Sequence, residues 1–149
     1  MAITNTIIPD FIEDLGEEIH NFESDNIDII LSNTAPASES SNPLTSGNGA
    51  STNVTAISYT NYSDDLTTDR RLESVVWNEA SGVCALDAGD VTITASGGTL
   101  ATFQYVYVYN QTSSRLITVV DLDEAVSLTD GSSRTISWSA NGLVRLTIS

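Results

Sequence analysis

The segment 90–110 constrains the fold of this chain more than any other part of the sequence. It reads DVTITASGGTLATFQYVYVYN: a β-branched run, a Ser-Gly-Gly turn, and a longer run with an aromatic residue at every second position. Those aromatic residues are Phe103, Tyr105, Tyr107 and Tyr109. A spacing of two is the period of a β-strand, and no helix places side chains on one face in that way. We therefore expect a β-hairpin in which the chain reverses at the glycines.

The aromatic run is apolar on both of its faces. Val106 and Val108 alternate with the tyrosines, so neither face of the expected strand is polar. A strand that is apolar on both faces usually lies inside a sheet that is covered on both sides. We expect the row to lie in the core, or in the core of a subunit contact. The alternative is an exposed aromatic platform on which sugars or bases stack.

The rest of the chain carries short β-type runs separated by turn signals. Further strands are expected at 27–33, 54–62, 72–77, 83–86, 115–122, 126–128, 135–139 and 143–148. Asn141 and Gly142 stand between the last two runs, and this dipeptide is a strong hairpin signal. Short strands at such spacing are typical of an all-β fold. We predict a single-domain β-sandwich over residues 1–149, of jelly-roll or barrel-like type, with one N-terminal helix.

The N-terminal third supplies an arm, a helix and a loop. Residues 1–9 predict an extended apolar arm that ends at a proline. In residues 10–23 the apolar side chains recur every three or four positions, which predicts one amphipathic helix with Asp10 as a possible N-cap. Residues 37–53 are rich in Ser, Asn, Gly and Pro, with Leu44 as the one large apolar side chain. We expect a surface loop that is long enough to contact a neighbouring molecule.

The charge of the chain excludes several classes of partner. Twenty acidic residues oppose five basic ones, which gives a net charge of −15, and the chain has no lysine. Binding to nucleic acid depends on Lys and Arg that replace counterions, so we expect no direct contact with nucleic acid. An anionic membrane surface is disfavoured for the same reason. The arginines are suited to paired hydrogen bonds with carboxylates, within the protein or across an interface.

Sequence signals for targeting and modification are weak. No run of eighteen apolar residues is present, and the N-terminus lacks the basic start and apolar core of a signal peptide. We expect a mature chain that begins at Met1 or Ala2 inside a cell. Three N-x-[ST] sequons are expected by chance in a chain this rich in Ser and Thr. The lone Cys84 has apolar neighbours, which favours a buried, inert thiol over a reactive nucleophile.

The side chains that carry catalysis or bind metals are sparse. We expect the single histidine, His20, to lie at a helix end as a capping or surface residue, because no second ligand or nucleophile accompanies it. The acidic clusters at 64–65 and 121–124 predict a solvated acidic face, with a calcium site or a glycosidase pair as alternatives. Trp77 and Trp138 are expected as core anchors. We predict no enzymatic activity, no cofactor and no metal site.

Several sequence fragments follow one another in order along almost the whole chain. They lie at 20–25 (HNFESD), 31–36 (LSNTAP), 90–98 (DVTITASGG), 103–112 (FQYVYVYNQT), 116–121 (LITVVD), 128–131 (LTDG) and 141–143 (NGL). Together these fragments resemble a family of small virion structural proteins of tailed bacteriophages. The resemblance implies a decoration or cement protein, made in the host cytoplasm, that binds the outside of the head. It implies no catalytic residue.

The implied partners are the major capsid protein and further copies of the same chain. Symmetric assemblies multiply weak contacts, and an acidic β domain with a polar loop and an apolar arm suits such binding. We expect Ile3, Ile7, Ile8 and Leu44 in the contact regions. One alternative is a tail tube, adaptor or fibre-associated subunit. Another is a carbohydrate-binding module that uses the tyrosine row and an acidic calcium site.

Overall fold

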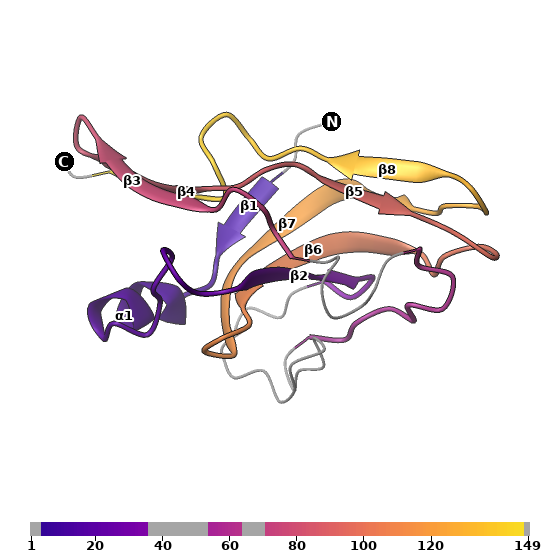
Figure 1. Ribbon diagram of the computed structural model, residues 1–149, viewed down its shortest axis with the longest axis horizontal. Helices are drawn as coiled ribbons and strands as arrows, with labels where there is room; N and C mark the ends of the chain where they lie inside the picture. The colour runs from indigo at the N-terminus through magenta and orange to yellow at the C-terminus, as the bar shows by residue number, and fades with distance from the viewer. Residues whose placement is uncertain (1–3, 36–53, 64–70, 148–149) are drawn as a thin grey trace.

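The computed structural model describes residues 4–35, 54–63 and 71–147 of the chain. These residues form an all-β fold with one short helix near the N-terminus, as the sequence predicts (Figure 1). The elements, in chain order, are β1 (Thr4–Ile7), α1 (Asp10–Gly16), β2 (Ile27–Ser32), β3 (Val76–Ala80), β4 (Val83–Asp87), β5 (Val91–Thr94), β6 (Phe103–Asn110), β7 (Arg115–Val126), β8 (Ser133–Ile136) and β9 (Val144–Thr147).

The strands form one large sheet and two small ones. The large sheet has the order β1-β7-β6-β2, and the small sheets have the orders β3-β4-β9 and β5-β8. In Figure 1 the β3–β4 and β5–β8 pairs run along the same side of the large sheet. Buried side chains from all three sheets belong to one core cluster. The helix α1 lies at one end of this arrangement, beside the turn that joins β6 to β7 (Figure 1).

The aromatic strand β6 lies inside the large sheet, as predicted from its two apolar faces. It pairs with β2 on one side and with β7 on the other, antiparallel in both cases. Tyr107 and Tyr109 are buried, and Val106 and Val108 are buried on the opposite face. The row therefore belongs to the core. It offers no exposed platform for stacked sugars or bases.

The predicted hairpin within 90–110 is wrong. The first run, β5, pairs with β8 in a separate sheet, whereas β6 pairs with β2 and β7. The turn at Gly97 and Gly98 packs against Asn61, whose side-chain amide donates a hydrogen bond of 3.0 Å to the Thr99 carbonyl. At Gly98 a Cβ would lie 2.8 Å from that amide nitrogen. The glycines are needed because another chain segment packs against the turn, and the strands on either side lie in different sheets.

Two further strand predictions also need correction. Residues 54–62 form no strand in the structure: the segment crosses from the edge of β2 to the end of β5, and only isolated bridges at Ala56 and Tyr62 pair with those strands. The backbone N–H of Leu31, in β2, donates to the Tyr59 hydroxyl at 2.9 Å. This side-chain hydrogen bond takes the place of the backbone hydrogen bond that a neighbouring strand would make. The Asn141–Gly142 turn joins β8 to β9, but these strands lie in different sheets and form no hairpin.

The strand expected at 72–77 begins later, because the backbone of Ser74 is left-handed, with φ of 52°. An extended strand cannot pass through that conformation. The observed strand is β3, which pairs with β4. Elsewhere the expected strands 27–33, 83–86 and 115–122 match β2, β4 and the first part of β7.

The predicted N-terminal arm is a strand of the large sheet. β1 pairs with β7, and the Ile8 backbone N–H then donates to the Ile117 carbonyl at 3.0 Å. Ile8 is 2% exposed and belongs to the core, so its side chain is not available for the contact expected of it. Ile7 is half-buried and packs against the same core. Ile3, Leu44 and the loop 37–53 lie outside the described residues.

The helix predicted over 10–23 ends much earlier, at Gly16. Glu18 adopts the left-handed conformation, with φ of 59°, and the backbone N–H groups of Glu18 and Ile19 turn back to the carbonyls of Leu15 and Asp14. This pattern is a Schellman motif, which satisfies the last carbonyls of a helix and stops it. Carboxylates at this end also oppose the helix dipole. At the other end Pro9 precedes the helix and no side chain caps it, so the expected Asp10 cap is not formed.

Candidate functional site

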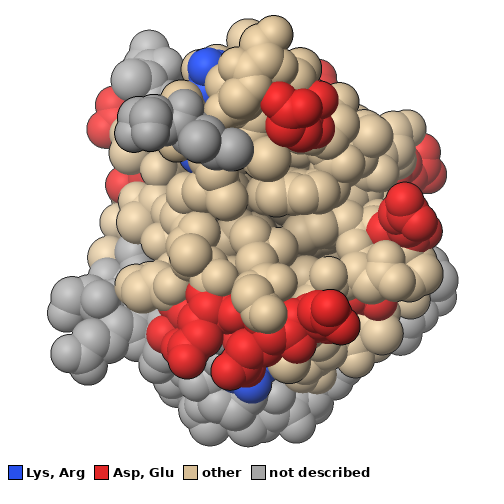
Figure 2. Space-filling view, turned by 90° about the vertical axis from the view of Figure 1, so that its left-hand side faces the viewer, with Lys and Arg blue, Asp and Glu red and all other residues tan. Residues whose placement is uncertain are grey.

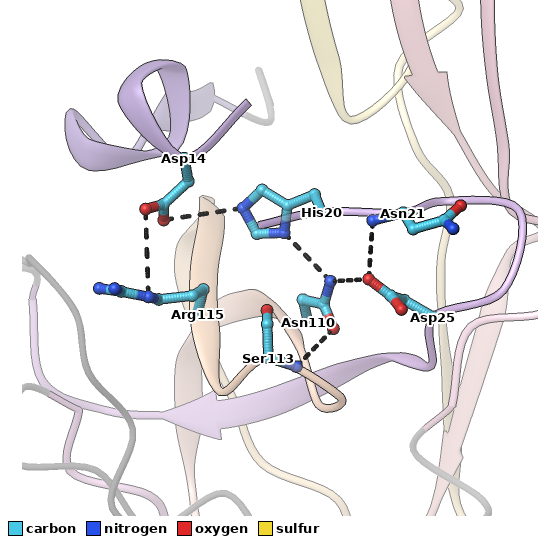
Figure 3. Close-up of polar contacts among 7 residues, drawn as sticks. All are labelled: Asp14, His20, Asn21, Asp25, Asn110, Ser113 and Arg115. Atoms are coloured by element: carbon cyan, nitrogen blue, oxygen red, sulfur yellow. Dashed lines mark hydrogen bonds and ion pairs between the residues drawn. The ribbon is translucent and has the colours of Figure 1, made fainter. Parts of the chain in front are cut away.

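A polar cluster lies where α1, the connection 17–26 and the β6–β7 turn meet. It consists of Asp14, His20, Asp25, Asn110 and Arg115, and Figure 3 shows their side chains pointing toward one another. Asp14 comes from α1, His20 and Asp25 from the connection, and the other two from the ends of β6 and β7. The cluster joins segments that are far apart in the sequence.

Asn110 is the centre of the polar cluster and is fully buried. Its Nδ2 donates to Asp25 Oδ2 at 2.6 Å and faces His20 Nδ1 at 3.1 Å. Its Oδ1 accepts the backbone N–H of Ser113 at 3.1 Å. A buried polar side chain is costly unless its hydrogen bonds are made, and here one carboxamide satisfies three partners. Asn110 therefore fixes the connection 17–26 against the β6–β7 turn.

Backbone groups of the connection 17–26 also make hydrogen bonds, both within the connection and to the β6–β7 turn. Asp25 Oδ2 accepts the N–H of Asn21 at 2.8 Å, which closes a tight turn over residues 21–25. The N–H of Asn26 donates to Thr112 Oγ1 at 3.0 Å, and the N–H of Gln111 returns a bond of 2.8 Å to the Asn26 carbonyl. These contacts make residues 20–26 a fixed surface in the fold.

His20 is not the surface residue that we expected, because its side chain is 0% exposed. Asn110 donates toward Nδ1, which assigns the ring proton to Nε2, and Nε2 faces Asp14 Oδ2 at 3.7 Å. Burial lowers the pKa of His20 below its usual value, while the Asp14 and Asp25 carboxylates oppose this change. The Arg115 guanidinium adds to the lowering and lies 4.0 Å from Asp14 Oδ1. The imidazole is therefore neutral at pH 7.

The geometry of the polar cluster suits a structural connection better than a reaction centre. A general base needs a free lone pair that a substrate can reach, and the accepting nitrogen of His20 already faces Asn110. Ser113 Oγ is buried without a hydrogen-bond partner among the described residues, and no contact pairs it with the imidazole. Among those residues there is also no group of three or more His, Cys, Asp or Glu side chains placed to hold a metal ion.

A hollow lies directly beside the polar cluster and shares His20 with it. Its volume is about 710 Å³, and it is lined by Leu15, Glu18, His20, Asn21, Phe22, Glu23, Val75, Val76 and Trp77. Its floor is a ladder of rings: Phe22 stacks on His20 and on Trp77, in both cases with centroids 5.5 Å apart. Phe11 lies beneath the ladder, 5.2 Å from the imidazole.

The surface around the hollow combines apolar and acidic groups. Within the described residues, the exposed large hydrophobic side chains are Ile12 of α1, at 49%, and Val76 of β3, at 50%. Ile12 and Leu15 are three residues apart in α1, so they share one side of the helix, and Leu15 lines the hollow. Figure 2 looks onto this end of the molecule and shows a broad uncharged area with carboxylates gathered along its lower border. We call this surface the α1–β3 face.

The other sequence predictions about reactive residues have mixed outcomes. The acidic group at 121–124 is engaged within the fold: Asp121 Oδ1 accepts Gln104 Nε2 at 3.0 Å, and Glu124 pairs with Arg134 at 3.2 Å. Residues 64–65 lie outside the described part of the chain. Cys84 is half-buried and free. Trp138 packs against the core as expected and donates its ring N–H to a carbonyl at 2.7 Å.

Local sequence contains only a weak signal for the polar cluster. A polar Asn110 directly after a row of buried aromatic residues is unusual, because it ends a strand that is otherwise apolar on both faces. If Asn110 is buried, its side chain requires polar partners. His20 and Asp25 can be those partners only if the N-terminal helix ends before residue 20. The predicted helix 10–23 concealed that arrangement.

Comparison of the chain with protein-family models, curated proteins and solved structures gives no match. No helix in the described part of the chain is long and apolar enough to cross a membrane.

Proposed function

We propose that this chain is a non-enzymatic virion structural protein, a decoration or cement protein that binds the major capsid protein on the outside of a bacteriophage head. The observation that carries the proposal is the α1–β3 face. It places exposed apolar side chains and carboxylates on a surface that the polar cluster holds rigid. Exposed apolar groups bordered by polar ones are typical of protein–protein contact sites.

The distribution of charge supports a protein partner. The described arginines are engaged within the fold, so they leave no basic patch for a phosphate backbone: Arg71 with Asp28, Arg115 with Asp14, Arg134 with Glu124, and Arg145 with Asn141. The carboxylates are in large excess, with a net charge of −15 for the whole chain. Such a surface repels nucleic acid and attracts a basic protein surface.

The fragments that carry the phage resemblance meet in pairs inside the fold. Fragment 20–25 meets fragment 103–112 in the polar cluster. Fragment 31–36 meets the same strand, because the Tyr107 hydroxyl donates to the Thr34 carbonyl at 3.3 Å. Fragments 90–98 and 128–131 meet where Asp130 accepts the N–H of Gly97 at 2.8 Å. Their order and spacing therefore serve one fold, which supports treating them as a single signature.

Two alternatives to a head decoration protein are a carbohydrate-binding module, which fits the structure less well, and a tail protein, which fits it equally well. A carbohydrate-binding module is disfavoured because Tyr107 and Tyr109 are buried and the acidic groups near Asp121 bond within the fold. A tail tube, adaptor or fibre-associated protein would use the same rigid binding face, and its location in the particle separates it from the head protein.

The test is the protein composition of purified phage particles and of tail-less heads, measured by quantitative mass spectrometry. We expect the chain in both samples, at a fixed ratio to the major capsid protein. Presence in whole particles together with absence from tail-less heads would assign it to the tail. Absence from both would overturn the proposal.

A further inference from the structure

We propose that the hollow of the α1–β3 face binds a basic segment of the partner protein. An Arg or Lys side chain of that segment lies against Trp77 at the end of the ring ladder, between Glu18 and Glu23, and its apolar neighbours pack on Ile12 and Val76. The inference rests on the proposed function for the identity of the partner. Its chemistry follows from the residues of the hollow.

The ring ladder is suited to a flat or compact cation. Phe22 and Trp77 stack at 5.5 Å with an angle of 30° between their planes, and both are half-buried and line the hollow. Phe22 is stacked between His20 and Trp77, so the ring that can offer a face to a cation is Trp77 at the end of the ladder. A guanidinium or ammonium group within about 6 Å of the indole is attracted by the negative face of its π system. The stems of Arg and Lys are apolar and pack well on exposed aliphatic side chains.

The carboxylates of the hollow have no basic partner in the described part of the chain. Glu18 and Glu23 both line the hollow, and the basic side chains among those residues pair elsewhere. Carboxylates beside an apolar, partly enclosed surface create a focused negative potential, which favours a cation from outside. The combination of an unpaired carboxylate pair and a ring ladder specifies a positive ligand group flanked by apolar ones.

The same charges argue against a second copy of this chain on the face. Two such faces in contact would place Glu18 and Glu23 against the same residues of the other copy, and like charges across an interface are costly. The chain has no lysine that could complement them. An anionic ligand is excluded for the same reason. A basic segment of a different protein is the occupant that these groups complement.

The hollow is fixed before any partner binds. Glu18 is held at the end of α1 by the Schellman motif, and Glu23 donates its backbone N–H to Asn21 Oδ1 at 3.2 Å. Asn110 ties the same connection to β6 through Asp25. A surface that is already ordered loses little conformational entropy on binding, so even a short segment can bind measurably.

The experiment selects peptides from a random twelve-residue display library on the full-length protein at low salt, followed by affinity measurement on the selected peptides. We expect sequences enriched in Arg or Lys beside Trp, Leu or Ile, with affinity that falls as NaCl is raised. Amide shifts in NMR spectra should be confined to residues 12–23 and 75–77. Peptides without basic enrichment, or shifts centred elsewhere, would overturn the inference.

Two matched pairs of variants locate the site. Val76→Arg places a cation in the hollow and should weaken binding by about tenfold or more, whereas Ala80→Arg, about 13 Å along the same face of β3, should change it less than about twofold. Glu23→Gln should weaken binding by about two- to fivefold, which is the range of an exposed ion pair. Asp123→Asn, near the other end of β7, should have no effect.

Equal loss of affinity in both arginine variants would show attraction by overall charge alone and would refute the site. If Val76→Arg fails to fold, as judged by its circular dichroism, the Glu23 and Asp123 pair decides the question. These measurements use purified protein, so they stand apart from the particle composition that tests the proposed function. If the hollow binds basic peptides but the protein is absent from phage particles, the proposed function is overturned and the binding site still stands.

Discussion

Replacing Asn110 by alanine tests whether the polar cluster holds the α1–β3 face. The substitution removes the carboxamide that donates to Asp25, faces His20 and accepts the N–H of Ser113. A hydrogen bond to a charged group is worth about 1.5–3 kcal/mol and a neutral one about 0.5–1.5 kcal/mol. The three contacts belong to one side chain and are not additive, so we expect a loss of about 3 kcal/mol in the free energy of unfolding.

The loss is measured by urea unfolding monitored by tryptophan fluorescence. Trp77 lies in the ring ladder beside the polar cluster, and Trp138 packs at another part of the core, so the two report on the whole domain. A loss of about 3 kcal/mol corresponds to a fall in Tm of about 6–12 °C for a domain of this size. Hydrogen exchange should accelerate most in residues 20–26, because Asn110 anchors that connection.

Asn5→Ala is the matched control. Asn5 also bonds across the fold, but its two hydrogen bonds are long, at 3.3 and 3.4 Å, and its Oδ1 is buried with no hydrogen-bond partner among the residues that the structure describes. We expect this variant to cost less than about 1 kcal/mol. If the Asn110 and Asn5 variants differ by less than about 1 kcal/mol, the polar cluster does not have the structural role that we derive from its geometry.

Because burial lowers the pKa of His20, the unfolded chain binds this proton more readily. The neutral imidazole therefore contributes its full share of stability above the unfolded pKa of 6.5, and this share is lost as the pH falls through the folded pKa. In urea titrations at different pH values, His20→Gln should lose less free energy of unfolding than the parent protein as the pH is lowered. Glu18→Gly should raise the free energy of unfolding by about 1 kcal/mol, because φ is 59° there; an unchanged urea midpoint would contradict this. Gly142→Ala should lower the free energy of unfolding by about 3 kcal/mol, and Gly131→Ala by only about 1 kcal/mol. The backbone φ is positive at both positions, but a Cβ at Gly142 would meet the Leu86 carbonyl, whereas a Cβ at Gly131 would meet open space. Equal losses in thermal unfolding would show that the close approach is unimportant.

The sequence was sufficient for the class of fold and for the interior position of β6. Alternation by two and apolar character on both faces are local properties, and they decide whether a strand forms and whether it is buried. The partner of a strand is not a local property. Residues 90–98 carry the signals of a hairpin, yet β5 pairs with β8, because the glycines at 97–98 make room for Asn61. That contact joins segments that no local pattern connects.

The end of α1 shows a second limit of local patterns. The apolar spacing continues past Gly16, and the residue that stops the helix is Glu18, which adopts a left-handed backbone that its type does not favour. Tertiary contacts select that conformation, since His20 and Asp25 reach Asn110 only when the chain turns there. The candidate site was hidden for this reason. The apolar side chains of Ile7 and Ile8 suggest contact residues at the level of sequence, but Ile8 is apolar because it fills the core.

The most direct test of the proposed function is a cryo-electron microscopy reconstruction of the phage head. We predict repeated density on the outer surface that fits this domain, oriented so that α1 and β3 face a basic segment of the major capsid protein. Density for the domain only in the tail, or none on the particle, would contradict the proposed function. Density on the head with the α1–β3 face toward solvent would contradict the binding site alone.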